Sequence, residues 1–254
     1  MKAAGIATGM QNLRYVKPLA ALRALRTLFI DPSDTIAAIR VVRSLDAPAI
    51  AVLTERLRAD PDGRHILAER PSLLATLGDR GMLAALPTGT LGRTYLAFCD
   101  REGITPGGLV EAADAVPMPA IGEEQIYVAN RMRDSHDLLH VVSGYQTDLA
   151  GELALLAFSF AQTYSPGVGM LAAGGLMQSM KFGAEGRQVR QLARSAYMRG
   201  RRAAYLPAIE WETWLSRPLD DVRRALRLSA PPIYSPVLLD DLRAAMAAPS
   251  IRAS

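Results

Sequence analysis

The pattern of apolar and polar residues along the chain is typical of helices rather than strands. β-Branched and aromatic residues do not gather in alternating runs, whereas Ala, Leu, Arg and Met fill the stretches between Pro and Gly residues. Residues 31–34 (DPSD) predict the end of one helix and the N-cap of the next, which we expect over residues 34–45. Another helix is expected over residues 47–59, and residues 60–63 (DPDG) are typical of a turn. The sequence therefore predicts an all-α fold.

Proline and glycine residues divide the next part of the chain into short helices. Breaks are expected at residues 70–72, 87–90, 105–108 and 117–119. No period of 20–50 residues repeats, which argues against a solenoid, and no stretch is rich enough in Gly, Ser or charge to be an interdomain linker. We therefore expect residues 1–254 to form a single domain of many helices.

The first part of the chain, residues 1–30, is basic and contains no acidic residue. Basic side chains at Arg14, Lys17, Arg23 and Arg26 interrupt each apolar run, whereas a secretory signal needs an uninterrupted one. On a helical wheel Arg23 and Arg26 fall among the apolar residues, which leaves no clean face for lying on a membrane. We expect a helix in residues 1–30 that docks on the rest of the domain.

A stretch of 28 residues without charge, residues 153–180, is long enough to span a bilayer. Residues 162–167 (QTYSPG) divide it into apolar pieces of about ten residues, which are too short to cross. We therefore expect two buried helices, the second with small residues that permit close packing. The alternative is a slot for a long isoprenoid or acyl chain. That slot would be lined by Met170, Leu171, Leu176 and Met177.

Composition and charge narrow the class of protein. The chain has 254 residues, of which 50% are hydrophobic and 21% charged, a balance that excludes intrinsic disorder for most of its length. A single cysteine, Cys99, cannot form an internal disulfide, so a reducing compartment is expected. The net charge of +4 comes from 26 Arg and 3 Lys against 25 acidic residues, and it is too diffuse to indicate a nucleic-acid partner.

Two of the three histidines, His136 and His140, lie four residues apart. On a helix this spacing places both imidazoles on one face, where they can reach one metal ion about 2 Å from each nitrogen. Asp137 flanks that face and could ligate the metal, orient a histidine or act as a base. The third histidine, His65, is isolated, and we interpret it as a capping or packing residue.

A metal held by two histidines needs a further anionic ligand, and Asp148 and Glu152 are the first candidates downstream. A continuous helix would separate His140 from Glu152 by about 18 Å along its axis. Gly144 and Gly151 bracket a polar turn, which predicts a helix end and a new N-cap. The chain would then form an αα-hairpin that returns Glu152 to the histidines. The alternative is two partly buried histidines and a helix-terminal glutamate without a metal.

The sequence His136-Asp137-x-x-His140-x11-Glu152 is similar to the metal motif of the Coq-four family of ubiquinone (coenzyme Q) biosynthesis proteins. The resemblance covers roughly residues 30–230. Further segments that resemble the family are Pro61-Asp62-Gly63-Arg64, Glu69-Arg70-Pro71, Gly89-Thr90-Leu91-Gly92-Arg93-x-Tyr95, Arg131-x-Arg133-Asp134, Gly144-Tyr145, Asp148, Gly151-Glu152 and Trp211-Glu212.

The resemblance implies an all-helical protein of quinone synthesis that acts on a polyprenylated, 4-hydroxybenzoate-derived lipid at the membrane surface. It implies removal of the ring carboxyl at C1 with replacement by hydroxyl, and partnership with other ubiquinone biosynthesis proteins. It also implies a divalent metal, zinc or iron, at four metal-binding and catalytic residues: His136, Asp137, His140 and Glu152. Zinc has no redox chemistry of its own, whereas Fe(II) is common at sites of two histidines and one carboxylate.

A row of arginines supports a membrane or phosphate partner. If residues 187–201 are helical, Arg187, Arg190, Arg194 and Arg201 fall within an arc of about 60°. This face is either an ordinary solvated surface or a contact with anionic lipid. We expect a cytoplasmic protein bound peripherally to the inner face of the cell membrane, which is also compatible with a homo-oligomer.

Two other functions are alternatives. The first is a metallohydrolase, because HDxxH with a downstream glutamate imitates the HExxH zinc peptidases, although Asp137 is one methylene shorter than their general base. A His-Asp phosphohydrolase that uses His65 belongs to the same class. The second is a scaffold that binds prenylated lipids and partner enzymes around a structural metal. An open coordination position favours catalysis, and a saturated site of four ligands favours the scaffold.

Overall fold

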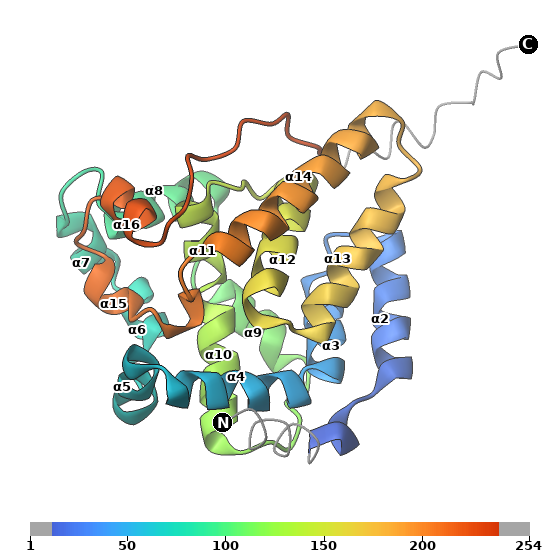
Figure 1. The fold of residues 1–254 in the computed structure, drawn as a ribbon, viewed down its shortest axis with the longest axis horizontal. Coiled ribbons are helices and arrows are strands. Elements are labelled where there is room, and N and C mark those ends of the chain that lie inside the picture. Colours follow the sequence, from blue (N-terminus) through green and yellow to red (C-terminus); the bar gives the residue numbers. More distant parts are fainter. Residues whose placement is uncertain (1–11, 239–254) are drawn as a thin grey trace, which may run out of the picture.

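The computed structural model describes residues 12–238, and the regular elements of this part of the chain are helices, as expected (Figure 1). In chain order they are η1 (Asn12–Tyr15), α2 (Pro18–Ile30), α3 (Thr35–Leu45), α4 (Ala47–Ala59), α5 (Pro61–Glu69), α6 (Leu73–Gly78), α7 (Arg80–Ala85), α8 (Leu91–Glu102), α9 (Gly108–Asp114), α10 (Glu123–Asp134), α11 (His136–Ser143), α12 (Leu149–Thr163), α13 (Pro166–Ser179), α14 (Ala184–Arg202), η2 (Leu206–Ala208), α15 (Trp211–Trp214) and α16 (Leu219–Ala225). They form one all-α domain.

The helix boundaries in the first third of the chain follow its capping residues. Asp34 accepts a hydrogen bond from the backbone of Ala37 and begins α3, as the sequence predicts, and α4 covers the expected residues 47–59. The turn predicted at residues 60–63 is wrong. Asp60 instead caps α5, and Pro61 occupies the first helical position, where proline is well tolerated because that backbone nitrogen has no partner within the helix.

A docking helix was predicted for residues 1–30, of which residues 1–11 lie outside the described residues, and helix α2 packs on the rest of the domain. It packs against α3 and α13 and buries Ala21, Ala24 and Leu25. Its other face leaves Leu19 and Leu22 exposed to solvent. The helix therefore carries apolar side chains on both its buried and its exposed face.

The charge-free stretch forms two helices that differ in burial. Helix α12 packs along α14 and α13, and its residues are mostly buried. Helix α13 is only partly buried, because Met177 and Met180 at its C-terminal end are exposed, which corrects the prediction of a fully buried second helix. Among the described residues, no helix is long and apolar enough to cross a membrane.

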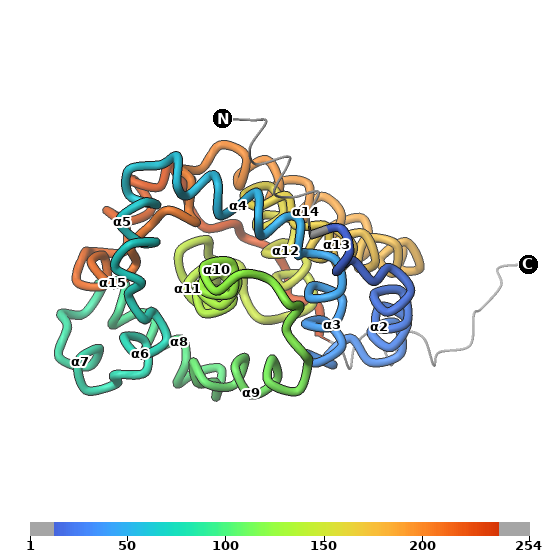
Figure 2. The backbone as a smooth tube through the Cα atoms, turned by 90° about the horizontal axis from the view of Figure 1, so that it is seen from below, coloured from blue at the N-terminus to red at the C-terminus, as the bar shows by residue number. Residues whose placement is uncertain are grey.

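Helices α10 and α11 follow one another near the centre of the domain, with α4, α12 and α14 on one side and α9 on the other (Figure 2). A buried ion pair holds α10 in place. Two guanidinium nitrogens of Arg131 each lie 2.8 Å from a carboxylate oxygen of Glu212, and one of them also donates to the carbonyl of Ile209. A buried charge is tolerated where it is paired in this two-pronged way. The ion pair thus fixes α10, the helix that directly precedes α11.

Candidate metal centre

The predicted αα-hairpin is present between α11 and α12. Helix α11 ends at Ser143, and its C-cap, Gly144, has a left-handed backbone (φ 78°), a conformation in which glycine is not strained. The N-cap of α12 is Asp148, whose carboxylate accepts from the backbone of Ala150 and Gly151. A Cβ atom at Gly151 would lie 2.1 Å from the carbonyl oxygen of Gln146, so the turn closes only with glycine there.

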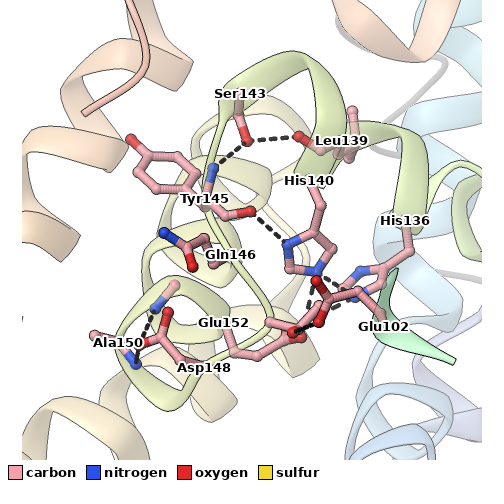
Figure 3. A network of polar contacts seen from close by, with 12 residues as sticks. Glu102, His136, Leu139, His140, Ser143, Tyr145, Gln146, Asp148, Ala150 and Glu152 are labelled. Carbon is pink, nitrogen blue, oxygen red and sulfur yellow. Dashed lines mark hydrogen bonds and ion pairs between the residues drawn. The ribbon is translucent and has the colours of Figure 1, made fainter. Parts of the chain in front are cut away.

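The hairpin brings Glu152 back to the two histidines (Figure 3). Nε2 of His140 lies 3.2 Å from one carboxylate oxygen of Glu152 and 3.3 Å from Nε2 of His136. Nε2 of His136 lies 3.7 Å from the other carboxylate oxygen. The three side chains together offer a group of ligand atoms within 4.8 Å of one another.

These separations fit a shared metal ion. Two ligand atoms bound to one tetrahedral ion at about 2.1 Å lie about 3.4 Å apart. The three measured distances, 3.2, 3.3 and 3.7 Å, are close to that value. Two imidazoles and one carboxylate suit zinc in a catalytic site and also suit non-haem Fe(II). The donor set therefore fits the metal that the sequence predicts without choosing between these ions.

The backbone fixes which nitrogen of His140 faces the site. Nδ1 lies 2.9 Å from the carbonyl oxygen of Tyr145, which can only accept, so Nδ1 carries the hydrogen. In the neutral ring Nε2 then keeps its lone pair and points at His136 and Glu152. Metal-binding histidines commonly donate their other nitrogen to a carbonyl in this way. The ring is also stacked at 5.8 Å on Phe98.

The charges around the site favour a cation. Burial raises the pKa of Glu152, but its hydrogen bond to His140 and the charges of both histidines lower it more, so Glu152 stays ionised. Burial lowers the pKa of His140, yet the hydrogen bond that Nε2 of the protonated ring donates to Glu152 leaves this pKa above its usual value. Burial, together with the charge of His140, holds the pKa of His136 below its usual value. A proton or a metal ion is therefore attracted to the Glu152 side.

Three other candidate residues lie outside this group. Asp137 is buried and lines the neighbouring cavity, and it is not part of the group of ligand atoms that His136, His140 and Glu152 form. Burial raises the pKa of Asp137, so its carboxyl holds a proton more readily than usual. Asp148 caps α12. His65 is largely exposed and lies 3.7 Å from Glu210, so it neither packs in the core nor joins the site.

A cavity of about 1410 Å³ opens in front of this ligand group of His136, His140 and Glu152. Its walls come from α2, α3, α4, α9, α10, α11, α12, α13, α14, η2 and α15, and they include His136, His140 and Glu152. Ordinary small-molecule pockets enclose about 300–1,000 Å³. The space is therefore larger than an aromatic ring alone requires, and most of its wall is apolar.

Of the four residues predicted to line an apolar slot, only one lines the cavity. Leu171 lines the cavity, as does Gly174 on the same helix. Met177 is exposed instead, while Met170 and Leu176 pack against core side chains. The cavity lies between helices from both halves of the chain, so α13 supplies only one of its walls.

Comparison with known proteins identifies the family. The family model described as "Coenzyme Q (ubiquinone) biosynthesis protein Coq4" matches residues 15–232. The chain belongs to the Coq4 family. The matched residues include both helices of the hairpin and therefore His136, His140 and Glu152. The resemblance stated from the sequence is thus confirmed.

Curated relatives are ubiquinone biosynthesis proteins named as mitochondrial. The human COQ4 homolog is 33% identical over 188 residues, which cover 73% of this chain and 68% of the relative. The zebrafish (Danio rerio) homolog is 34% identical over 71% of this chain and 65% of its own length. The protein of Pyricularia oryzae is 35% identical over 74% of this chain and 61% of its own length. The chain thus matches about two thirds of each relative.

A solved structure supports the fold. The crystal structure of a candidate ubiquinone biosynthesis protein from Nostoc punctiforme superposes with a TM-score of 0.65 and 22% sequence identity. The superposition covers 85% of this chain and all of that one. The arrangement of helices described above is therefore shared with a protein determined by experiment.

Proposed function

We propose that this protein is a metal-dependent enzyme that oxidatively decarboxylates a polyprenylated, 4-hydroxybenzoate-derived ring in ubiquinone biosynthesis. The observation that carries the proposal is that His136, His140 and Glu152 stand on the wall of a large apolar cavity. A prenyl tail needs apolar walls, and a carboxylated ring needs a cation beside it. Three protein ligands leave a coordination position open, which favours catalysis over a purely structural site.

The reaction must balance in atoms and electrons. The bond between C1 and the carboxyl carbon breaks and the carboxyl group leaves as CO2. A bond between C1 and a hydroxyl oxygen forms, and the proton of the carboxyl group balances that of the new hydroxyl. We propose that O2 supplies that oxygen and that a two-electron reductant, with two protons, converts the second oxygen to water. Bound Fe(II) would supply the redox chemistry, for which a site of two histidines and one carboxylate is suited.

The chain's own residues position the substrate and move protons. The carbonyl of Tyr145 holds the His140 ring so that Nε2 faces the metal position. Asp137 lines the same cavity, and its raised pKa allows it to donate a proton to, or accept one from, the ring substituents. The apolar walls exclude water, which protects the intermediates of an oxidation from side reactions.

A deletion strain tests this function in the cell. We expect loss of the protein to cause accumulation of the prenylated intermediate that retains its C1 carboxyl, as measured by mass spectrometry of lipid extracts. The wild-type gene should clear that intermediate, whereas His136→Ala should not, and His65→Ala, which lies outside the site, should act as wild type. Accumulation of an intermediate that has already lost the carboxyl would refute the proposed step.

The proposed partners follow from the substrate. A polyprenylated lipid stays in the bilayer, so we propose a protein bound peripherally at the inner face of the cell membrane, next to other ubiquinone biosynthesis proteins. One rim of the cavity suits this placement. Ile30, at the end of α2, is 81% exposed and lines the cavity, and Met180, after α13, is 65% exposed. Lys181 and Phe182 line the same opening.

The structure changes which arginines of the predicted row, residues 187–201, are free to contact a membrane. Arg190 is half-buried and donates to the carbonyl of Ser179 at 2.9 Å, so it serves the turn between α13 and α14. Arg187 and Arg194 are exposed. We propose that the apolar rim at Ile30 and Met180 inserts into the bilayer and that Arg187, Arg194 and Lys181 add attraction to anionic lipid.

Liposome flotation separates these two contributions. Ile30→Asp with Met180→Asp should reduce flotation with anionic and neutral vesicles alike, because burial of apolar surface is lost. Arg187→Glu with Arg194→Glu should remove only the preference for anionic vesicles, which should also weaken as salt is added. If the rim variant floats as wild type does under every condition, this rim is not the membrane contact.

A further inference from the structure

The chain after α16 crosses over the hairpin turn that precedes Glu152. We call residues 229–238 the C-terminal segment. Its Tyr234 hydroxyl accepts a hydrogen bond from the backbone of Gln146 at 2.8 Å and donates one to the second carboxylate oxygen of Asp148 at 2.9 Å. One phenol oxygen therefore joins the two sides of the turn.

Backbone contacts of Val237 continue this attachment. The backbone nitrogen of Val237 donates to the first carboxylate oxygen of Asp148 at 2.8 Å, and its carbonyl accepts from Leu149 at 3.0 Å. The same oxygen of Asp148 caps α12. The C-terminal segment and the first turn of α12 thus share one carboxylate, and neither can shift without disturbing the other.

Two glycines make room for the segment. A Cβ atom at Gly151 would lie 2.5 Å from the Tyr234 hydroxyl, and one at Gly144 would lie 2.5 Å from Cβ of Pro231. The segment therefore touches the turn at both of its ends, at Gly144, which caps the end of α11, and at Gly151, the residue before Glu152. On its other side the turn is held by Glu102 of α8, which accepts a hydrogen bond from Thr147.

Glu152 depends on where α12 begins. It lies four residues after Asp148, and its carboxylate must reach two histidines on a different helix. A small rotation or slide of the first turn would move the carboxylate out of ligand distance. Groups that orient a metal ligand from behind typically change metal affinity about 10–100-fold when they are removed.

We propose that Tyr234 is a positioning residue for the metal centre: through Asp148 and Gln146 it fixes the start of α12 and thereby holds Glu152 against His136 and His140. The inference rests on the proposed metal function. Tyr234 lies just beyond residues 15–232, so the family match does not include it. The role is assigned from the contacts of this chain alone.

Cobalt(II) binding tests the proposal, because the visible spectrum of this ion reports its ligand geometry. Tyr234→Phe keeps the ring but removes both hydrogen bonds, and we expect it to bind cobalt(II) about tenfold more weakly, with an altered spectrum. Tyr127→Phe is the matched control, since it removes one tyrosine hydrogen bond, to the carbonyl of Pro71, away from the site. It should leave both affinity and spectrum unchanged.

A second variant checks that Tyr234 acts through Asp148. Asp148→Asn keeps an oxygen for the cap but cannot accept from the phenol at its second position. The double variant should bind cobalt(II) no more weakly than the weaker single variant, because both remove the same link. Wild-type affinity and spectrum in Tyr234→Phe would overturn the positioning role while leaving the metal site intact. Absence of cobalt(II) binding in the wild type would instead overturn the proposed metal function and this inference with it.

Discussion

Purified His136→Ala and His140→Ala proteins are expected to lose most of the bound divalent metal that the wild type retains. Each variant removes one of three ligand atoms that lie 3.2–3.7 Å apart, and two remaining ligands hold a divalent ion poorly. Loss of one ligand should weaken affinity by at least the roughly 10–100-fold that follows loss of a supporting contact. Elemental analysis after dialysis gives the metal content directly.

The matched control for this experiment is His65→Ala, which removes the histidine that lies outside the ligand group. It should keep the wild-type metal content. Asp137→Asn should also keep it, because the structure places Asp137 beside the cavity and outside the group. Wild-type metal content in both His136→Ala and His140→Ala would show that the metal is bound elsewhere.

Filling the cavity is expected to reduce bound prenyl lipid by about tenfold or more. Ala129 on α10 and Ala112 on α9 line the space and are only partly buried, so Ala129→Phe and Ala112→Phe should place a ring in the space proposed for the lipid. Steric overlap of this kind makes the binding free energy less favourable by about 1–3 kcal/mol. Mass spectrometry of lipids that co-purify with each folded variant measures the loss.

A suitable control is Ala173→Phe, because Ala173 is exposed on α13 and does not line the cavity. Gly174 also lines the cavity, but Gly174→Leu is a poorer choice of variant. A Cβ atom at Gly174 would lie 2.8 Å from Leu25 and 3.3 Å from Phe29, so a leucine would press against α2 as well as the cavity. If Ala129→Phe and Ala112→Phe retain the lipid of the wild type, the cavity does not hold it.

Much of the candidate metal centre could be predicted because its residues lie close together in the sequence. The i, i+4 spacing placed both histidines on one helix face, and Gly144 and Gly151 implied the turn that returns Glu152. The same helical geometry places Asp137 beside that face. A residue adjacent to His136 points about 100° away from it around the helix, and Asp137 lies next to the cavity, outside the ligand group.

The remaining contacts of the site are long-range or involve the backbone. Phe98 stacks on His140 from a distant helix, and the Tyr145 carbonyl is a group that every residue carries. Tyr234 meets Asp148 across 86 positions of sequence. No spacing rule connects such partners, because tertiary packing alone brings them together. The cavity could not be placed for the same reason, since its walls come from helices in both halves of the chain.

Carbon dioxide release from a labelled substrate is the most direct test of the function proposed for the cavity and its metal group. Metal-loaded wild-type protein would be given O2, a reductant and a polyprenylated 4-hydroxybenzoate derivative with ¹³C in its ring carboxyl. We expect ¹³CO2 and an equal amount of ring product hydroxylated at C1, with its new oxygen derived from ¹⁸O2, and neither product from His140→Ala. Wild-type protein that holds both metal and lipid, yet releases no more ¹³CO2 than His140→Ala, would contradict the account.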